Sequence, residues 1–393
     1  MRRVVITGIG PVCAGKIGAV DFFQGLLAKK AVLCPIAPEY ERHYRFNSRF
    51  FVPAPRLPET GDAEKGVDDF TRIALHCAAL ALQDAGLDNL AGGGVILGVG
   101  MGGLNTALPS YVAHATGAGR FNRLVIPLSM PNAAAAWIGI RHGADRDGFT
   151  VNAACASGTV ALGEALRKIQ DGRLELVLSG GVECLTDPSG AMMRGFDALQ
   201  TLTRAADGLP RPFSKQRSGF LFNMGAGCAL VLEERERAMT RGARIYAELL
   251  DYAACTAASN IVALPEDPAP LIALFKIAAG LRVDYFNAHG TGTVQSDRVE
   301  RDIIRAVWGE DQPYVSATKG IIGHCLGASG ALEAAATALS IHHGQAHGNL
   351  TDDLMEGVHC PLDSADLAIE HALSASYGFG GHHALLLLKK HRP

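Results

Sequence analysis

The 393-residue sequence lacks several features that would assign it to a special class of protein. No apolar run approaches the roughly 20 residues that a membrane-spanning helix requires, and the richest one, residues 133–140, ends at Arg141. The nine cysteines include no CxxC pair, which argues against a disulfide framework and a structural zinc site. Because 36 Lys and Arg stand against 39 Asp and Glu, nothing indicates a nucleic-acid-binding surface.

From the pattern at the amino terminus we expect no secretory signal. After Met1-Arg2-Arg3 the chain soon becomes glycine-rich, without the longer apolar segment of a secretory signal. The composition, 48% hydrophobic and 19% charged, is that of an ordinary globular protein. We therefore expect a cytoplasmic protein whose mature chain begins at Met1.

What the sequence does contain is a regular alternation of short β-rich runs and helical segments. The expected strands cover residues 4–9, 94–99, 150–153, 174–178, 244–250, 283–288, 314–317 and 384–388. Many of the 46 glycines follow apolar runs, where strand-to-helix turns need backbone freedom. The alternation predicts an α/β fold with a covered, largely parallel sheet.

An internal repeat divides the chain. Ala156-Ser157-Gly158 and Ala328-Ser329-Gly330 each open an amphipathic helix, and the two helices end at the same interval, before Gly172 and Gly344. A glycine at that place suits the left-handed position that follows many helices. Equal lengths with matching ends predict two related halves, residues 1–250 and 251–393.

Cys155 is the candidate nucleophile. It follows the small residues Asn152-Ala153-Ala154, which lead from an expected strand straight into the first repeat helix. At a helix N-terminus, unpaired N–H groups and the helix dipole favour thiolate over thiol and can hold an oxyanion. An arbitrary cysteine is more often a buried structural thiol, but this placement favours a catalytic role.

Three further residues stand in similar glycine-rich settings. His289 follows an expected strand, His324 precedes the second repeat helix, and Lys319 lies five residues before His324. Taken singly, each is more simply explained as a structural or solvated side chain. A catalytic role for these three residues requires that the fold bring them close to Cys155.

Together these segments resemble the β-ketoacyl synthase family, in the branch that elongates acyl chains on carrier proteins. The resemblance covers essentially the whole chain, and the order and spacing of its motifs make it specific. It rests on residues 4–10, 154–158, 289–293, 318–324, 327–330 and 377–381. It implies a thiolase-like fold, with two related βαβαβ-type halves in α-β-α-β-α layers.

The resemblance also implies a mechanism. Cys155 would take an acyl group from a thioester, with the backbone N–H groups of Cys155 and Phe379 as the oxyanion hole. His289 and His324 would stabilise the enolate that forms when a malonyl thioester loses carbon dioxide. Lys319, paired with Glu300, would orient the histidines.

Substrate contacts are implied by the same resemblance. Thr291 and Thr293 match positions that bind a phosphopantetheine arm, and Tyr377 stands beside Phe379 in a loop that gates the acyl pocket. Phe196 and Met101 are weaker candidates for lining that pocket, because such residues are more often plain core. His382 and His383 have no third ligand at a suitable spacing, so we expect no metal site.

Several positions depart from the family pattern. An expected Arg-Asp-Gly-Phe run carries Ser218 in place of Asp, and an expected Gly-Glu pair is replaced by Asn223-Met224. The Asn that usually comes after the final glycine pair is replaced by His383. The His that commonly stands five residues after the nucleophile is replaced by Val160. These changes surround the site and leave its reacting groups in place. They bear on substrate choice, on rate and on the ordering of nearby loops.

The expected partner is an acyl carrier protein whose phosphopantetheine carries the substrates, and no other cofactor is expected. The basic residues left for its docking are Lys65, Arg120, Arg123, Arg204 and Lys215. So few charges suggest a specialised pathway with its own carrier. We expect a homodimer, or a heterodimer with a ketosynthase-like subunit, and neither nucleic acid nor membrane as a partner.

Two alternatives remain open from the sequence. The same fold could serve a decarboxylating or priming enzyme, or an acyltransferase that uses Cys155 without forming a carbon–carbon bond. The chain could also be a non-catalytic subunit that sets chain length. Such subunits typically lack the nucleophile, so the presence of Cys155 argues against the second alternative.

Overall fold

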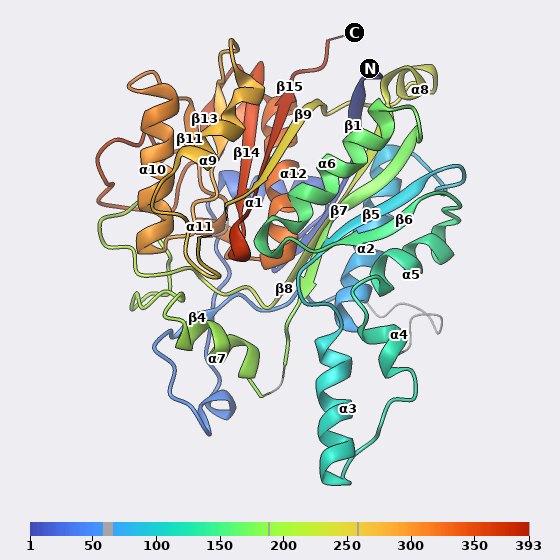
Figure 1. The fold of residues 1–393 in the computed structure, drawn as a ribbon, viewed down its shortest axis with the longest axis vertical. Helices are drawn as coiled ribbons and strands as arrows, with labels where there is room; N and C mark the ends of the chain where they lie inside the picture. Colours follow the sequence, from blue (N-terminus) through green and yellow to red (C-terminus); the bar gives the residue numbers. More distant parts are fainter. Residues whose placement is uncertain (58–65, 188, 258, 393) are drawn as a thin grey trace.

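A computed structural model describes residues 1–57, 66–187, 189–257 and 259–392 (Figure 1). Its main feature is one central sheet with the strand order β11-β10-β14-β15-β9-β1-β8-β7-β5-β6, and β2 beside β1. The bounds of the first half are β1 (Val4–Cys13), β2 (Lys16–Ile17), β5 (Gly94–Val99), β6 (Gly148–Val151), β7 (Leu176–Cys184) and β8 (Gly225–Glu234). Those of the second half are β9 (Ala247–Thr256), β10 (Tyr285–Asn287), β11 (Tyr314–Ser316), β14 (His371–Tyr377) and β15 (His382–Lys389).

The two halves of this sheet have the same topology. From each outer edge inward, two parallel pairings are followed by antiparallel ones, β6-β5-β7-β8-β1 in one half and β11-β10-β14-β15-β9 in the other. They meet where β1 pairs antiparallel with β9, over the short register from Val4↔Leu249 to Ile6↔Ala247. The repeat read from the sequence is therefore a repeat of topology as well.

Helices cover both faces of each half. The longer ones are α1 (Ala19–Leu27), α2 (Asp69–Ala85), α3 (Leu104–Thr116), α5 (Ala133–His142), α6 (Ser157–Gln170), α7 (Ala191–Ala198), α10 (Val294–Trp308) and α12 (Ser329–His343). The shorter ones are α4 (Val125–Ser129), α8 (Arg235–Thr240), α9 (Ala269–Ile272) and α11 (Lys319–Ile322). Two small strand pairs lie off the sheet, β3 (Cys34–Pro35) with β4 (Phe50–Phe51) and β12 (Gln345–Ala346) with β13 (Ala365–Asp366).

The layering follows from the side chains that each strand turns to its two faces. On β5, Ile96 packs into a central core that contains α6 and α12, while Val95 and Leu97 pack outward against α2 and α5. On β15, alternate leucines likewise face the central core or an outer core beneath α10. The layers thus follow the order helix, strand, helix, strand, helix, in which each half of the sheet forms one strand layer and α6 and α12 form the middle helix layer (Figure 1). This is the expected thiolase-like arrangement.

The sequence prediction needs two corrections. The sheet is mixed rather than largely parallel, because β8 and β15 run antiparallel to both of their neighbours. Both β8 and β14 were missed: β8 begins Gly225-Ala226-Gly227, and β14 carries small polar residues, so neither has the long β-branched run that marks a strand. The boundary expected at residue 250 falls within β9 and remains a prediction.

The repeat helices end as the sequence indicated. Gly172 and Gly344 have φ values of 74° and 65° just beyond α6 and α12. Before each helix comes a 3₁₀ turn, Ala154–Ala156 or Leu326–Ala328, and the first residue of each turn has a positive φ, 49° at Ala154 and 47° at Leu326. Along the described parts of the chain, no helix is both long and apolar enough to cross a membrane.

The close contact between α6 and α12 gives a test of this core. A Cβ at Gly330 would come within 2.0 Å of Thr159 Oγ1 and 2.7 Å of the Thr159 nitrogen. We expect Gly330→Ala to lower the free energy of unfolding by about 2 kcal/mol or more, because the backbone cannot yield at an overpacked site. Urea unfolding measures this.

The matched control is Gly195→Ala in α7, where an added Cβ meets nothing within 4 Å. That change should be neutral or slightly stabilising, since alanine favours the helix. Equal unfolding midpoints for Gly330→Ala and the wild type would show that the two helices are not in tight contact.

Candidate active site

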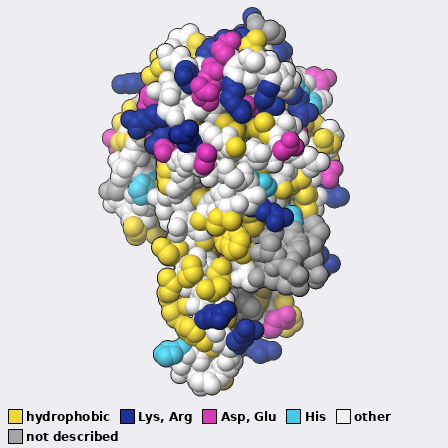
Figure 2. Space-filling view, turned by 90° about the vertical axis from the view of Figure 1, so that its right-hand side faces the viewer, with side chains coloured by type: hydrophobic (Ala, Val, Ile, Leu, Met, Phe, Trp, Pro, Cys, Tyr) yellow, Lys and Arg dark blue, Asp and Glu magenta, His cyan; other side chains and the backbone are white. Residues whose placement is uncertain are grey.

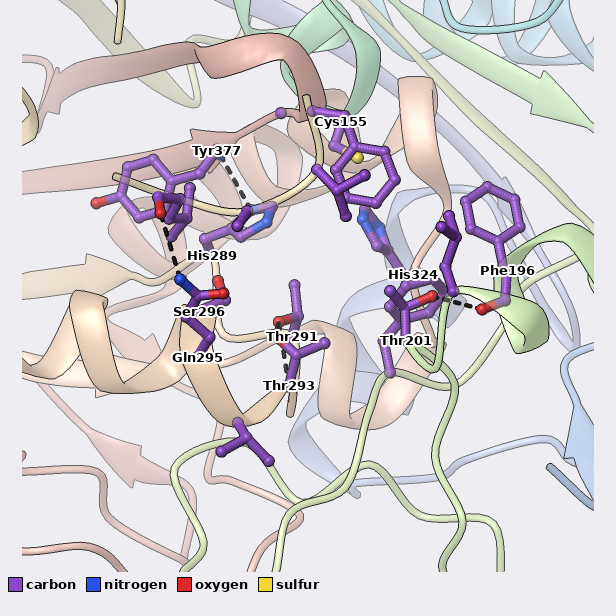
Figure 3. A pocket seen from close by; sticks show the side chains of 18 of the residues that line it. Cys155, Phe196, Thr201, His289, Thr291, Thr293, Gln295, Ser296, His324 and Tyr377 are labelled. Atoms are coloured by element: carbon purple, nitrogen blue, oxygen red, sulfur yellow. Dashed lines mark hydrogen bonds between the residues drawn. The ribbon is translucent and has the colours of Figure 1, made fainter. Parts of the chain in front are cut away.

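A cavity of about 290 Å³ brings together residues from both halves. Figure 3 shows Cys155 above the imidazole rings of His289 and His324, with Thr291 and Thr293 further along the cavity. Of the residues predicted from the sequence, the cavity is lined by Cys155, Phe196, His289, Thr291, Thr293, His324, Tyr377 and Phe379. Segments up to 224 residues apart in the sequence (379 − 155) therefore meet at one sulfur.

Local strain presents Cys155 to the cavity. Ala154 adopts the left-handed region at φ 49°, which costs energy for a residue with a Cβ. Two side chains hold it there: Asn152 Oδ1 accepts the Ala154 N–H at 3.1 Å, and Ser157 Oγ donates to the Ala154 carbonyl at 2.6 Å. Ser157 Oγ also accepts the Ala153 N–H at 2.9 Å. The turn is thus fixed on both sides of the cysteine.

Burial controls the protonation of the Cys155 thiol. It raises the pKa of Cys155 to about 11, while the Lys319 charge and the N–H groups of Phe379 and Cys155 act in the opposite direction. The helix N-terminus was expected to favour the thiolate, but desolvation outweighs the favourable groups. At neutral pH the resting sulfur is therefore mainly a thiol.

The hydrogen bonds to His289 fix its tautomer. Its Nδ1 accepts from the Lys319 ammonium at 3.2 Å and from the Tyr377 N–H at 3.3 Å. Because Nδ1 accepts, the ring hydrogen of the neutral imidazole is on Nε2. Burial and the nearby Lys319 charge lower the pKa of His289 well below its ordinary value, so the ring stays neutral.

His324 has the same tautomer for a different local reason. Its Nδ1 accepts the Leu326 N–H at 3.3 Å and lies 3.0 Å from Ser329 Oγ. Burial and Lys319 lower the pKa of His324 well below its ordinary value. The ring centroids of His289 and His324 lie 5.8 Å apart, and the two ring planes meet at 88°. The site therefore contains two neutral Nε2–H donors side by side.

The predicted partner of Lys319 was wrong. The Lys319 ammonium forms its ion pair with Glu333 of α12, not with Glu300, and also donates to the His289 carbonyl at 2.8 Å. The side chains of Lys319, Glu333, Glu300 and His289 are all buried. Glu333 stands one turn into a helix of small apolar residues, so an isolated carboxylate in that helix was the signal that sequence reasoning overlooked.

Glu300 instead holds the backbone that carries His289. Its two carboxylate oxygens accept the N–H groups of His289 at 2.7 Å and Gly290 at 2.8 Å. Asp297, one turn earlier on α10, accepts the N–H groups of Thr291 at 3.2 Å and Gly292 at 3.1 Å. Burial raises the pKa of Glu300 to about 8 and of Asp297 to about 6. The sequence analysis missed Asp297.

Met101 is a second correction, because it does not line this cavity. Its side chain is 45% exposed, and its N–H donates to Glu183 at 3.0 Å.

Several lining residues were not predicted: Leu199, Gln200, Thr201, Phe220, Val262, Ala263, Leu264, Val294, Gln295, Ser296, Leu326 and Gly378. Half of them closely follow Phe196 or Thr293, and that nearness in sequence is the only signal that could have found them. Val262, Ala263 and Leu264 come from a loop without a motif.

The positions that depart from the family pattern surround the site. Ser218 lines the cavity, and Met224 packs in the same apolar cluster as Cys155. His383 is buried 5.6 Å from the Tyr377 ring, and Val160 packs against the central core. Asn223 bonds to the turn before His324.

The residues proposed for carrier docking are mostly exposed. Arg120, Arg123 and Arg204 lie on the surface, and Lys215 is 3.6 Å from Asp353. Lys65 lies outside the described residues. Within the described ranges, no three His, Cys, Asp or Glu side chains gather in a way that would hold a metal ion.

Comparison with known sequences identifies the family. The pattern of the β-ketoacyl synthase N-terminal domain matches residues 1–238, and that of the C-terminal domain matches residues 246–351. The chain belongs to the β-ketoacyl synthase family. It is 32% identical to a 3-oxoacyl-[acyl-carrier-protein] synthase 2 of Synechocystis sp. over 100% of this chain and 99% of the relative. It is 36% identical to the Staphylococcus aureus protein of the same name over 82% of each.

Solved β-ketoacyl synthase structures share the fold over the full length of both chains. One is a type II polyketide synthase acyl-carrier protein in complex with its ketosynthase bound to the hexaketide, with a TM-score of 0.87 and 26% identity. Another is the ishigamide ketosynthase/chain length factor, with a TM-score of 0.88 and 26% identity. A third, a β-ketoacyl synthase from Burkholderia phymatum, has a TM-score of 0.88 and 28% identity. Each of these three covers 100% of both chains.

The buried thiol gives a test by pH. Because burial raises the pKa of Cys155 to about 11, the thiolate fraction rises with pH throughout the neutral and mildly alkaline range. We expect alkylation of Cys155 by iodoacetamide to speed up about tenfold for each pH unit between about pH 7 and pH 9, without a plateau. Peptide mass spectrometry separates Cys155 from the partly exposed Cys34 and Cys255. A plateau near neutral pH would show that the thiolate is stabilised more than burial opposes it.

Proposed function

We propose that this protein is an elongating β-ketoacyl-acyl carrier protein synthase that joins an acyl group on Cys155 to a malonyl-type thioester. The observation that carries the proposal is the placement of two neutral Nε2–H donors, on His289 and His324, beside one buried thiol. A pair of donors aimed at one space is what a developing enolate oxygen needs.

The first half-reaction transfers the acyl group to the cysteine. The Cys155 sulfur attacks the acyl thioester carbonyl, its proton passes to the departing carrier thiol, and the carrier carbon–sulfur bond breaks. We assign the carbonyl oxygen to the N–H groups of Cys155 and Phe379, since both groups lower the pKa of the Cys155 thiol. Lys319 assists because its charge favours the thiolate.

The second half-reaction forms the new carbon–carbon bond. A malonyl thioester loses carbon dioxide, and the electrons of that bond form an enolate whose oxygen accepts from His289 and His324. The enolate carbon then attacks the acyl carbonyl, and the Cys155 sulfur leaves with the electrons of the broken thioester bond. Because their pKa values lie well below the ordinary range, both imidazoles stay donors rather than acids.

Two threonines mark a route for the carrier arm along the cavity. Thr291 Oγ1 and Thr293 Oγ1 lie 3.0 Å apart on the loop that Asp297 holds, and both line the cavity. We assign them to the phosphopantetheine arm of an acyl carrier protein. The small number of basic residues left for carrier docking, together with the changes at Ser218 and Asn223, favours a specialised pathway. The expected cytoplasmic location remains a prediction.

The alternative reactions use only part of this arrangement. An acyltransferase needs Cys155 and an oxyanion hole but not two enolate donors, and a decarboxylating enzyme needs the donors but not the acyl-cysteine. A non-catalytic subunit needs neither, so the joint presence of Cys155, His289, His324 and Lys319 in one cavity disfavours it. The half-reactions can be separated by experiment.

We expect Cys155→Ala to abolish acylation, while His289→Ala lowers decarboxylation about a hundredfold more than it lowers acylation, since it removes an enolate donor. Intact-protein mass spectrometry after reaction with a panel of acyl carriers, housekeeping and pathway-specific, measures acylation and identifies the preferred acyl group. Release of carbon dioxide from malonyl carrier measures decarboxylation.

Two outcomes would contradict this division of labour. Acylation of the Cys155→Ala variant would remove the nucleophile assignment, and equal loss of both half-reactions in His289→Ala would remove the histidine assignment. Condensed product should be heavier than the starting acyl group by one malonyl unit less carbon dioxide. A product without the added carbons would favour the priming or acyltransferase alternative.

We further propose that the protein works as a homodimer through the face formed by α3 and α4. Figure 2 shows hydrophobic side chains gathered in the lower half of this face. The large exposed ones include Tyr111, Val112, Leu124, Ile126 and Met130, each 49–63% exposed. Among the described residues, strand β6 pairs only with β5, so its other edge is open to a second copy.

The neighbouring ketosynthase/chain length factor assembly gives the alternative of a heterodimer. We expect the double change Leu124→Glu with Ile126→Glu to weaken self-association about a hundredfold or more, because it places charges in an apolar interface. Light scattering after gel filtration measures the mass. Val20→Glu, at a site 76% exposed on α1, is the control and should leave the dimer intact. A wild-type monomer that pairs only with a ketosynthase-like subunit would favour the heterodimer.

A further inference from the structure

The position of His324 depends on a short backbone turn that follows α11. This helix begins at Lys319 and ends at Ile322, and Gly323 then takes φ 73° and ψ −180°, a conformation that favours glycine. His324 comes directly after it. Any shift of this turn therefore moves the ring that offers an Nε2–H to the cavity.

Three hydrogen bonds to the segment just before β8 hold the turn, two from the backbone and one from a side chain. The His324 N–H donates to the Leu221 carbonyl at 2.7 Å, and the Asn223 N–H donates to the His324 carbonyl at 3.3 Å. The third bond comes from a side chain: Asn223 Nδ2 donates to the Ile322 carbonyl at 2.8 Å. That carbonyl is the last one of α11, and a helix offers no N–H of its own to its last carbonyl.

The other end of the Asn223 amide is also used. Its Oδ1 accepts the Gly225 N–H at 2.9 Å, and the residue is 2% exposed. The side chain therefore spans from the first residue of β8 to the last carbonyl before Gly323, with both of its polar ends satisfied in a dry environment. Glycine, the residue of the family pattern at this position, makes neither bond.

We propose that Asn223 is a positioning residue for His324 in the condensation half-reaction. It fixes the Ile322–His324 turn from the β8 side, while Ser329 and the Leu326 N–H fix the imidazole from the α12 side. The turn also contains the end of the helix that carries Lys319. Cys155 belongs to the other repeat turn, and Lys319 is held separately by Glu333 and the His289 carbonyl, so we expect acylation to change little when Asn223 is replaced.

Asn223→Asp and Asn223→Gly test this proposal. The first keeps size and the acceptor but sets a carboxylate oxygen against the Ile322 carbonyl, and the second removes both bonds. We expect malonyl-carrier decarboxylation to fall about tenfold or more in Asn223→Asp and about threefold in Asn223→Gly, mainly in kcat, with acylation of Cys155 within about twofold of wild type.

Asn349→Asp is the matched control. Asn349 is likewise 2% exposed, its Oδ1 accepts the Ala317 N–H at 2.7 Å and its Nδ2 donates to the Val315 carbonyl at 2.8 Å. A buried carboxylate there should lower stability without separating the two half-reactions. Unfolding midpoints of all variants show which of them are folded at the assay temperature.

The proposal rests on the proposed condensation chemistry, and the two fail in different ways. If wild-type protein neither acylates Cys155 nor decarboxylates malonyl carrier, the proposed function is wrong. If wild type does both and Asn223→Gly decarboxylates at the wild-type rate, or if both half-reactions fall equally in the Asn223 variants, the positioning role is wrong.

Discussion

The buried ammonium of Lys319 acts on every reacting group of the site. It donates to Nδ1 of His289 and so fixes the tautomer of that ring, and its charge lowers the pKa of His289, of His324 and of the Cys155 thiol. Such a charge can stay buried only because Glu333 pairs with it and the His289 carbonyl accepts from it. Breaking the pair would leave an uncompensated charge among the groups it organises.

The two halves use one structural device for two purposes. In each half a strained residue, Ala154 or Leu326, opens a 3₁₀ turn that leads into a central helix. In the first half the strain presents the Cys155 sulfur, and in the second it aims the Leu326 N–H at Nδ1 of His324. The serine that begins each helix, Ser157 or Ser329, accepts an N–H from the residue four before it. In the proposed function, the repeat thus supplies a nucleophile on one side and a hydrogen-bond donor on the other.

The sequence predicted what depends on local pattern and erred where contacts cross between helices. The strand 94–99 was found to the residue, and the repeat located both turns. The predicted Lys319–Glu300 ion pair was wrong because Glu300 and Glu333 both lie on helices, α10 and α12. Spacing along the chain cannot show which of these two helices brings its carboxylate to the Lys319 ammonium. Met101 was misplaced for a related reason: its side chain follows a loop whose direction is set by Glu183, far away in sequence.

Excluding water from this cavity has opposite effects on the two half-reactions. Burial lowers the pKa values of His289 and His324, which keeps both rings as neutral donors and, in the proposed mechanism, serves decarboxylation. The same burial raises the pKa of Cys155 and opposes formation of the nucleophile. A carbanion must be protected from protons, so the site cannot be opened to water to help the thiol. In the proposed mechanism a fixed positive charge resolves this conflict, because the Lys319 charge favours the thiolate without supplying a proton donor as acidic as an imidazolium. Lys319 acts on the thiol of one half and on both histidines of the other, and this shared charge lets one dry cavity perform both half-reactions.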